Sequence, residues 1–186
     1  MLEPAKWVER YADGLLRHAL FRVKDRETAE DIVQDVFLSA YKSRDNYTGA
    51  ANEKTWLFAI LKNKIIDHYR SKLRKLSALT EPVSNYESYY FNPADEDHWR
   101  NERAPANWAT DGVSQLEKKE LNKALQDCIG KLPEKMSVAF TLKFIEEVET
   151  DAICKDLQIT PSNYWVLMHR AKLQLRECLE KNWFDK

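Results

Sequence analysis

Glycine is scarce in this sequence, and its scarcity limits the folds that the chain can adopt. Four of the 186 residues are glycine, whereas an all-β fold needs many tight turns, for which glycine is a preferred residue. Long stretches are instead rich in Leu, Ala, Lys, Glu and Arg, which have high helix propensities. We therefore predict an all-α fold.

The bulk composition narrows the class of protein. A content of 44% hydrophobic and 32% charged residues is typical of a globular chain that holds one ordinary domain or two small ones. No apolar run approaches the roughly 18 residues that cross a bilayer, and the N-terminal stretch has neither a basic leader nor a signal-type apolar core. These features predict a cytoplasmic protein without direct membrane insertion.

Three cysteines stand far apart in the sequence, at Cys128, Cys154 and Cys178. Their number is odd, and no histidine lies near them at the spacing of a zinc site. We therefore expect reduced thiols in the core, with neither a disulfide framework nor a bound metal.

The net charge of −1 hides two segments of opposite charge. Residues 54–75 hold seven basic side chains and one acidic side chain, a net charge of +6. Residues 76–116 hold two basic and seven acidic side chains, a net charge of −5. This segregation predicts a surface that binds a polyanion in the first segment and an acidic connector in the second.

Apolar periodicity predicts two groups of helices. In residues 1–75, helices are expected from Pro4 to about Lys24, from about Thr28, and from Thr55 onward, closing a small bundle. In residues 117–186, four helices are expected, the second starting at Pro133 and the last at Thr160, so that the final pair forms a helix-turn-helix. Residues 76–116 have three prolines and many aromatics, which predicts an acidic, aromatic-rich linker that either packs on the domains or docks in a partner.

The stretch EDIVQDVFLSAYKS, residues 30–43, predicts an amphipathic helix with a leucine on its polar side. Ile32, Val33 and Val36 share the apolar face, because helical residues repeat every 3.6 positions. The opposite face is formed by Asp31, Gln34, Asp35 and Leu38. A single exposed leucine is common in proteins, so an incidental Leu38 and a docking anchor are both compatible with this pattern.

The last predicted helix has a core stripe on one side and a polar arc on the other. No acidic residue lies between Pro161 and Arg176. Donor, basic and exposed apolar groups at the start of the second helix of a helix-turn-helix favour reading of duplex DNA over a merely solvated face. The arc consists of Ser162, Trp165, Val166, His169 and Arg170, with Lys172 at its border.

The helix that begins at Thr55 carries basic residues interleaved with aromatic and amide side chains. Trp56 and Asn63 lie on one stripe, flanked by Lys62 and Lys64. Such a surface suits unpaired bases, because rings stack on bases and an amide can bond a base edge. Packing of Trp56 against neighbouring helices explains the same pattern. We find no Ser/His/Asp set, phosphate-binding glycine loop or acidic metal cluster, so we expect no enzyme activity, cofactor or small-molecule substrate.

The order of these motifs resembles that of a bacterial sigma factor of the extracytoplasmic-function (ECF) type. The motifs are DIVQDVF, a polar loop, WLFAILKNKIIDHYR, a variable linker, LPEKMSVAFTLKFIEE and HRAKLQLRECLEKNWF. The resemblance covers both ends of the chain and leaves out chiefly the linker. It implies an initiation factor that joins core RNA polymerase, recognises promoters and opens DNA, and that a membrane-linked anti-sigma protein holds inactive.

The resemblance also implies a role for each group of residues. The first group, the polar face of residues 31–38, would dock on the clamp helices of the largest polymerase subunit, with Leu38 as an apolar anchor. The second would bind the melted minus-10 region and capture a flipped base. The third would bind the minus-35 element. These groups are Asp31, Gln34, Asp35 and Leu38; then Asn46, Tyr47, Lys54, Trp56, Lys62, Asn63 and Lys64; then Ser162, Asn163, Trp165, Val166, His169, Arg170 and Lys172.

The sequence departs from the family pattern at three positions. Arginines and small residues are commoner where Trp165 and Leu167 stand, so the promoter sequence is not fixed by the resemblance. Cys154 replaces a more usual alanine, which we interpret as packing. Two other classes of function stay open from the residues alone: a stand-alone helix-turn-helix regulator with an N-terminal dimerisation or sensing bundle, and an adaptor that binds only acidic proteins.

Overall fold

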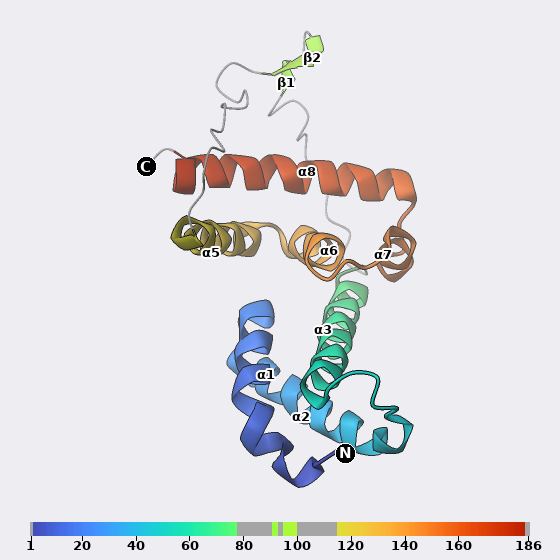
Figure 1. The fold of residues 1–186 in the computed structure, drawn as a ribbon. Helices are drawn as coiled ribbons and strands as arrows, with labels where there is room; N and C mark the ends of the chain where they lie inside the picture. Colours follow the sequence, from blue (N-terminus) through green and yellow to red (C-terminus); the bar gives the residue numbers. More distant parts are fainter. Residues whose placement is uncertain (1, 78–90, 93–94, 100–114, 185–186) are drawn as a thin grey trace. The chain divides into compact units, whose positions relative to one another are not determined.

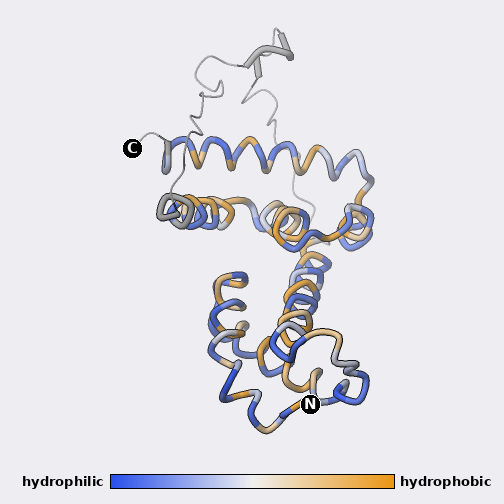
Figure 2. The backbone as a smooth tube through the Cα atoms, in the orientation of Figure 1, coloured by the Kyte–Doolittle hydropathy of each residue, from blue (hydrophilic) through white to orange (hydrophobic). Residues whose placement is uncertain are grey.

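The computed structural model describes residues 2–77, 91–92, 95–99 and 115–184, which divide between two compact helical units, Met1–Ser71 and Lys72–Lys186 (Figure 1). The prediction of an all-α fold with two small helical domains is confirmed, apart from one short hairpin. Hydrophilic and hydrophobic residues alternate along each helix (Figure 2), as expected for helices with one buried face.

Three helices and two short turns form unit 1. The turn η1 (Pro4–Lys6) leads into α1 (Trp7–Val23), followed by α2 (Arg26–Lys42), the turn η2 (Arg44–Asn46) and α3 (Glu53–Ser77), which runs past the boundary of the unit. The helices bury their predicted apolar faces in one core. Its fully buried members are Leu15, Ala19, Ala29, Val36, Ala40, Leu57, Leu61 and Ile65.

Side-chain caps fix the starts of α2 and α3. The Asp25 carboxylate accepts a hydrogen bond of 2.8 Å from the Thr28 amide, so α2 begins two residues before the predicted Thr28. The Asn52 side chain accepts a bond of 2.8 Å from the Thr55 amide in the same way, and α3 begins at Glu53. Helix α1 ends where expected, because Lys24 adopts a left-handed conformation.

A two-stranded antiparallel ribbon lies within the segment that was predicted as a linker. Strand β1 (Phe91–Asn92) pairs with β2 (Asp95–Trp99), with Phe91 opposite Trp99 and an irregular register between the two pairs. Strands this short leave too little alternation for sequence analysis to detect. Residues 78–90 and 100–114 lie outside the described residues, and with them the question of what the linker contacts.

The described residues 115–184 of unit 2 form four longer helices and a terminal turn. They are α5 (Gln115–Lys131), α6 (Glu134–Phe144), α7 (Thr150–Leu157), α8 (Pro161–Leu179) and η4 (Glu180–Phe184), a single π-turn. Left-handed Gln158 ends α7, and the Thr160 hydroxyl caps α8 by accepting from the Asn163 amide at 3.3 Å. The short turn between α7 and α8 is the predicted helix-turn-helix connection.

The cysteines correct the sequence prediction. Cys128 of α5 and Cys178 of α8 form a disulfide, with Cα atoms 5.8 Å apart, so the prediction of reduced thiols is wrong for this pair. Cys154 is free and buried, as predicted. Cysteines 50 positions apart carry no sign of proximity in the sequence, and the packing of α5 on α8 brings this pair within bonding range.

Two absences can be stated for residues 2–77, 91–92, 95–99 and 115–184. No helix among them is long and apolar enough to cross a membrane. No group of three or more His, Cys, Asp or Glu side chains suited to hold a metal ion was found in those ranges.

Candidate protein-binding and nucleic-acid-binding surfaces

Helix α2 exposes every residue of the predicted docking surface. Ile32, Val33 and Val36 are buried and α2 packs on α1, so the helical period turns the other face outward. The side chain of Leu38 is 58% exposed. The structure thus brings an apolar side chain and three hydrogen-bonding side chains onto one face, which we call the α2 surface: Asp31, Gln34, Asp35 and Leu38.

Tyr41 enlarges the apolar part of the α2 surface and was missed in the sequence analysis. It is 54% exposed and follows Leu38 by three positions, which places it on the neighbouring turn of the same face. The guanidinium of Arg44 lies 4.2 Å from the centre of its ring, a favourable cation–π position. The spacing from Leu38 was the signal that could have identified it.

Lys64, one of the residues predicted to bind the minus-10 region, contacts a residue predicted to dock on polymerase. Its ammonium lies 3.7 Å from the carboxylate of Asp35 on the α2 surface. The Asp35 side chain is 62% exposed, so solvent screens this pair and its contribution to stability is small. Lys64 is also half-buried, which distinguishes it from Lys62 and Asn63, the exposed residues that precede it on the same helix.

An aromatic cluster surrounds the first turn of α3. The ring of Trp56 lies 5.9 Å from that of Trp7 in an edge-to-face arrangement and 5.1 Å from that of Tyr47, centre to centre. The Tyr47 hydroxyl donates a hydrogen bond to the Ala51 carbonyl, which closes the loop between α2 and α3 over this cluster. Trp56 therefore packs within unit 1 and is half-buried.

Glu53 fastens the start of the chain to this cluster. Its carboxylate accepts hydrogen bonds from the Glu3 amide at 2.6 Å, from the Trp7 indole at 3.1 Å and from the Tyr11 hydroxyl at 3.2 Å. Glu53 was not predicted as a site residue, because an acidic residue in a first helical turn indicates a favourable interaction with the helix dipole and no long-range partner. Glu53 thus holds the Trp7 indole, whose ring packs against Trp56, and is a positioning residue for Trp56.

The ionisation of Glu53 and Tyr11 reflects these contacts. Burial acts to raise the pKa of Glu53, but the hydrogen bonds from Glu3, Trp7 and Tyr11 outweigh it, and the pKa is lowered below 4.5. Burial raises the pKa of Tyr11, and its bond to the Glu53 carboxylate raises it further. Glu53 is therefore ionised at neutral pH and holds the three donors as a carboxylate.

The remaining predicted minus-10 residues lie along the loop and α3. Asn46 in η2 and Lys54 in the first turn of α3 are exposed beside the aromatic cluster. Asn63 lies two helical turns beyond Trp56 on the same face, and Lys62 is its exposed neighbour. The structure therefore groups Asn46, Tyr47, Lys54 and Trp56 at the start of α3 and places Lys62 and Asn63 further along it.

Helix α8 presents the predicted DNA-reading residues on its outer face. Trp165 is 58% exposed and Val166 is 42% exposed, while Tyr164 and Met168 are buried. Arg170 is half-buried, whereas the other six residues of the predicted set are exposed. We call this face the α8 surface: Ser162, Asn163, Trp165, Val166, His169, Arg170 and Lys172.

The N-terminus of α8 is suited to a phosphate. No acidic residue lies in its first turn, so the positive end of the helix dipole is not neutralised there. At the other end of the α8 surface, the Lys172 ammonium lies 5.2 Å from the centre of the Phe144 ring, which is 47% exposed. Phe144 was not predicted, because it belongs to α6 and the sequence gives no sign of this contact.

Comparisons with known proteins match both units. Residues 7–75 match the model of Sigma-70 region 2, and residues 122–175 match that of Sigma-70, region 4. A probable RNA polymerase sigma factor of Haemophilus influenzae is 34% identical over 167 residues, covering 90% of this chain and 84% of that protein. The ECF RNA polymerase sigma factor SigW of Bacillus subtilis is 28% identical over 177 residues, covering 92% and 86%. SigM of the same organism is 24% identical over 168 residues, covering 90% of each.

Proposed function

The chain belongs to the ECF group of sigma-70 factors, and from this premise we propose which of its surfaces perform each step of transcription initiation. A sigma factor binds core RNA polymerase, directs it to promoters and promotes melting of the DNA. The assignment below divides these tasks among the α2 surface, the start of α3 and the α8 surface. The chain itself catalyses no reaction in this scheme.

The α2 surface docks on core RNA polymerase. The observation that carries this assignment is Leu38, 58% exposed among Asp31, Gln34 and Asp35. An apolar side chain that becomes buried at the centre of an interface supplies affinity, and the surrounding polar groups supply register and exclude water. Tyr41 extends the apolar centre by one turn of the helix.

The loop and the start of α3 bind the melted minus-10 strand. Strand separation costs a few kcal/mol for each unstacked base, and a pocket that stacks the base offsets this cost. Tyr47 and Trp56 provide the aromatic rings, while Asn46 and Lys54 beside them provide a hydrogen-bonding group and a positive charge. Further along α3, Lys62 and Lys64 provide positive charge and Asn63 provides an amide group for the same DNA strand.

The α8 surface reads the minus-35 element in duplex DNA. His169 and Arg170 can donate to base edges, and Trp165 and Val166 can contact a thymine methyl group. Ser162 and Asn163 bind phosphate at the N-terminus of α8, where no acidic residue neutralises the helix dipole, and Lys172 binds phosphate at the other end of the α8 surface. We also propose an anti-sigma protein as a partner that covers one or more of these surfaces.

Reconstitution with purified core polymerase tests this function. We expect transcripts with defined start sites from a promoter library only when the chain is added to the core enzyme. A stand-alone regulator would instead bind duplex DNA without any requirement for polymerase, and a protein-only adaptor would retain no nucleic acid at any salt concentration. The match to two sigma regions in their family order does not favour either alternative.

A further inference from the structure

The disulfide between Cys128 and Cys178 joins two helices through the core of unit 2. Cys128 of α5 is 1% exposed and belongs to the core cluster with Ile129 and Ala171. Cys178, near the end of α8, is less deeply buried. Cys178 is therefore the more accessible residue of the pair. It does not line the pocket described next, but Asn182, which does, contacts its sulfur.

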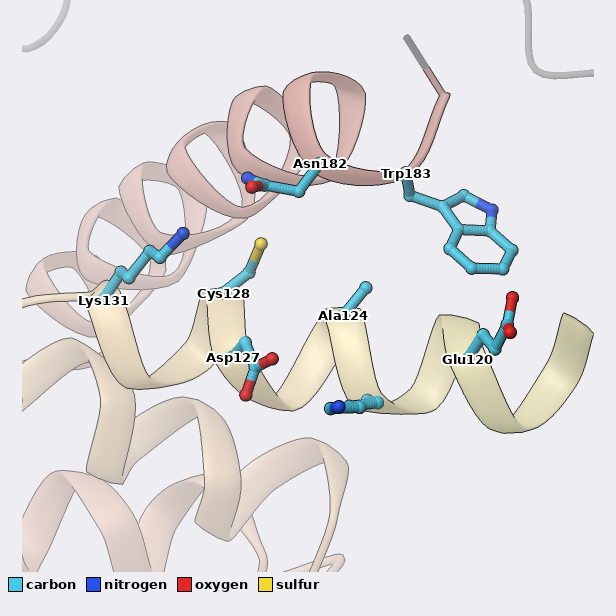
Figure 3. A pocket seen from close by; sticks show the side chains of 8 residues that line it. Glu120, Ala124, Asp127, Cys128, Lys131, Asn182 and Trp183 are labelled. Carbon is cyan, nitrogen blue, oxygen red and sulfur yellow. The ribbon is translucent and has the colours of Figure 1, made fainter. Parts of the chain in front are cut away.

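A pocket of about 390 Å³ lies beside this bond, between α5 and η4. Cys128 forms part of its wall, and Asn182 and Trp183 of η4 face α5 across it (Figure 3). The Asn182 amide nitrogen lies 2.6 Å from the Cys178 carbonyl oxygen and 3.5 Å from the Cys178 sulfur. Lys123 and Lys131 also line the pocket. The disulfide is thus next to a space that a small molecule can enter.

We propose that Cys128–Cys178 is a reversible thiol–disulfide exchange site that takes a small dithiol reductant through this pocket. The pocket volume falls in the range that holds small ligands. Lys123 and Lys131 are balanced by Glu120 and Asp127, so the charge of the lining does not repel a thiolate, which is the attacking form of a thiol. The Asn182 amide, as a donor to the Cys178 sulfur, stabilises the negative charge on that atom when Cys178 leaves as a thiolate in the second step of the exchange.

The exchange proceeds in two steps that balance. A thiolate of the reductant attacks the Cys178 sulfur and forms a mixed disulfide, while the Cys178–Cys128 bond breaks and Cys128 leaves as a thiolate that takes up a proton. The second thiolate of the reductant then attacks its own bonded sulfur and releases Cys178, which also takes up a proton. The protein gains two electrons and two protons, and the reductant becomes a cyclic disulfide. Reoxidation by a small disulfide is the reverse sequence.

The bond acts on the stability of unit 2 and leaves the α8 surface in place. It closes a loop across 50 positions of the chain, which restricts the unfolded state and stabilises the folded one. Cys178 lies thirteen residues beyond Trp165 on α8, a distance of about 20 Å along a helix. The oxidised chain therefore resists unfolding more strongly, while the residues of the DNA-reading face make the same contacts in both forms.

Redox titration of the full chain in buffers of reduced and oxidised dithiothreitol tests the site. After each incubation the native chain is quenched, unfolded in denaturant and alkylated, and the modified cysteines are located by peptide mass spectrometry. We expect one modified cysteine, Cys154, at the oxidising end and three at the reducing end. Three modified cysteines throughout, a bond that involves Cys154, or a disulfide that excess dithiol cannot reduce without denaturant would overturn the proposal.

Thermal unfolding of the same samples provides a second readout. We expect the oxidised chain to melt at least about 5 °C above the reduced chain. Cys178→Ser should lose this redox dependence, and Cys154→Ala should retain it as the matched control. The wild-type comparison needs no variant to fold, and coincident melting curves of its oxidised and reduced forms would contradict the proposal.

Discussion

Helices α2 and α8 expose an apolar side chain to the same extent but surround it with opposite charges. Leu38 and Trp165 are each 58% exposed. Asp35 and Asp31 lie one and two helical turns before Leu38 on the same face, whereas Lys172 lies two turns beyond Trp165 on its face. The N-termini of the two helices differ in charge in the same way. Helix α2 has an acidic N-cap and an acidic residue in its first turn, whereas α8 has no acidic residue in its first turn.

This difference teaches that exposure alone does not identify a partner. An exposed apolar side chain gains free energy by burial against any complementary surface. The charges around it decide which surfaces can approach, since acidic groups repel a phosphate backbone and basic groups attract it. We therefore assign α2 to a protein partner and α8 to DNA, and each prediction below tests one side of this contrast.

The largest expected effect is on polymerase binding through α2. Leu38→Asp should weaken binding to core polymerase at least about 30-fold, because it removes a hot-spot contact of about 2 kcal/mol and adds a charge at the centre of the interface. Fluorescence anisotropy of the labelled chain measures the affinity. Val8→Asp is the matched control, since Val8 is 61% exposed on α1, outside the α2 surface. Equal affinities of the two variants would refute the docking assignment.

The next effect concerns base reading by α8. Arg170→Ala should reduce the preference for the correct minus-35 element by about 1–3 kcal/mol, if the guanidinium bonds a guanine edge in two places. Lys172→Ala should instead weaken binding of holoenzyme to all promoters similarly and lower its salt dependence. Competition between intact and altered upstream elements separates the two results. A uniform loss for Arg170→Ala would show that it contacts only phosphate.

A smaller effect is expected on the stability of unit 1, where Glu53 and Glu27 are both acidic residues in the first turn of a helix. Glu53→Ala should lower the free energy of unfolding of this unit by about 1–2 kcal/mol, because three donors lose their carboxylate partner. Glu27 of α2 occupies a first turn as well and is exposed, so Glu27→Ala controls for the helix dipole. Urea denaturation of both variants gives the comparison. Equal losses would mean that the Glu53 bonds add no stability.

The smallest effect is a pH dependence of unit 1. Burial lowers the pKa of His18, and the nearby positive charge of Arg22 lowers it further. The stability from neutral His18 is therefore present above pH 6.5 and is lost as the pH falls through the lowered value. Unfolding midpoints from pH 7.5 to 5 should fall for the wild type and less for His18→Asn. Glu53, whose pKa is also lowered, contributes a loss only below pH 4.5. Parallel curves above pH 5 would rule out His18.

Helical periodicity predicted the exposed faces well, because burial of one side of a helix determines the other. Once Ile32 and Val36 are buried, Leu38 must face outward, and buried Tyr164 and Met168 turn Trp165 outward in the same way. The all-α fold and the helix-turn-helix followed from the same reasoning.

Contacts between distant positions could not be predicted from one sequence. The bond between Glu53 and Trp7 spans 46 positions, and the Cys128–Cys178 disulfide spans 50. Both depend on how helices pack, which no local pattern records. Trp56 shows the same limit, since its spacing fitted both packing and base stacking, and the structure shows packing against Trp7 and Tyr47.

The most direct test of the contrast between α2 and α8 is the affinity of core polymerase for two variants of the full chain, Leu38→Asp and Trp165→Asp. Both place the same charge at a position that is 58% exposed in its helix. We predict that Leu38→Asp loses polymerase binding and that Trp165→Asp keeps it within about threefold, a change of less than about 1 kcal/mol. Equal loss in both variants, or loss in Trp165→Asp alone, would contradict the assignment of separate partners to the two helices.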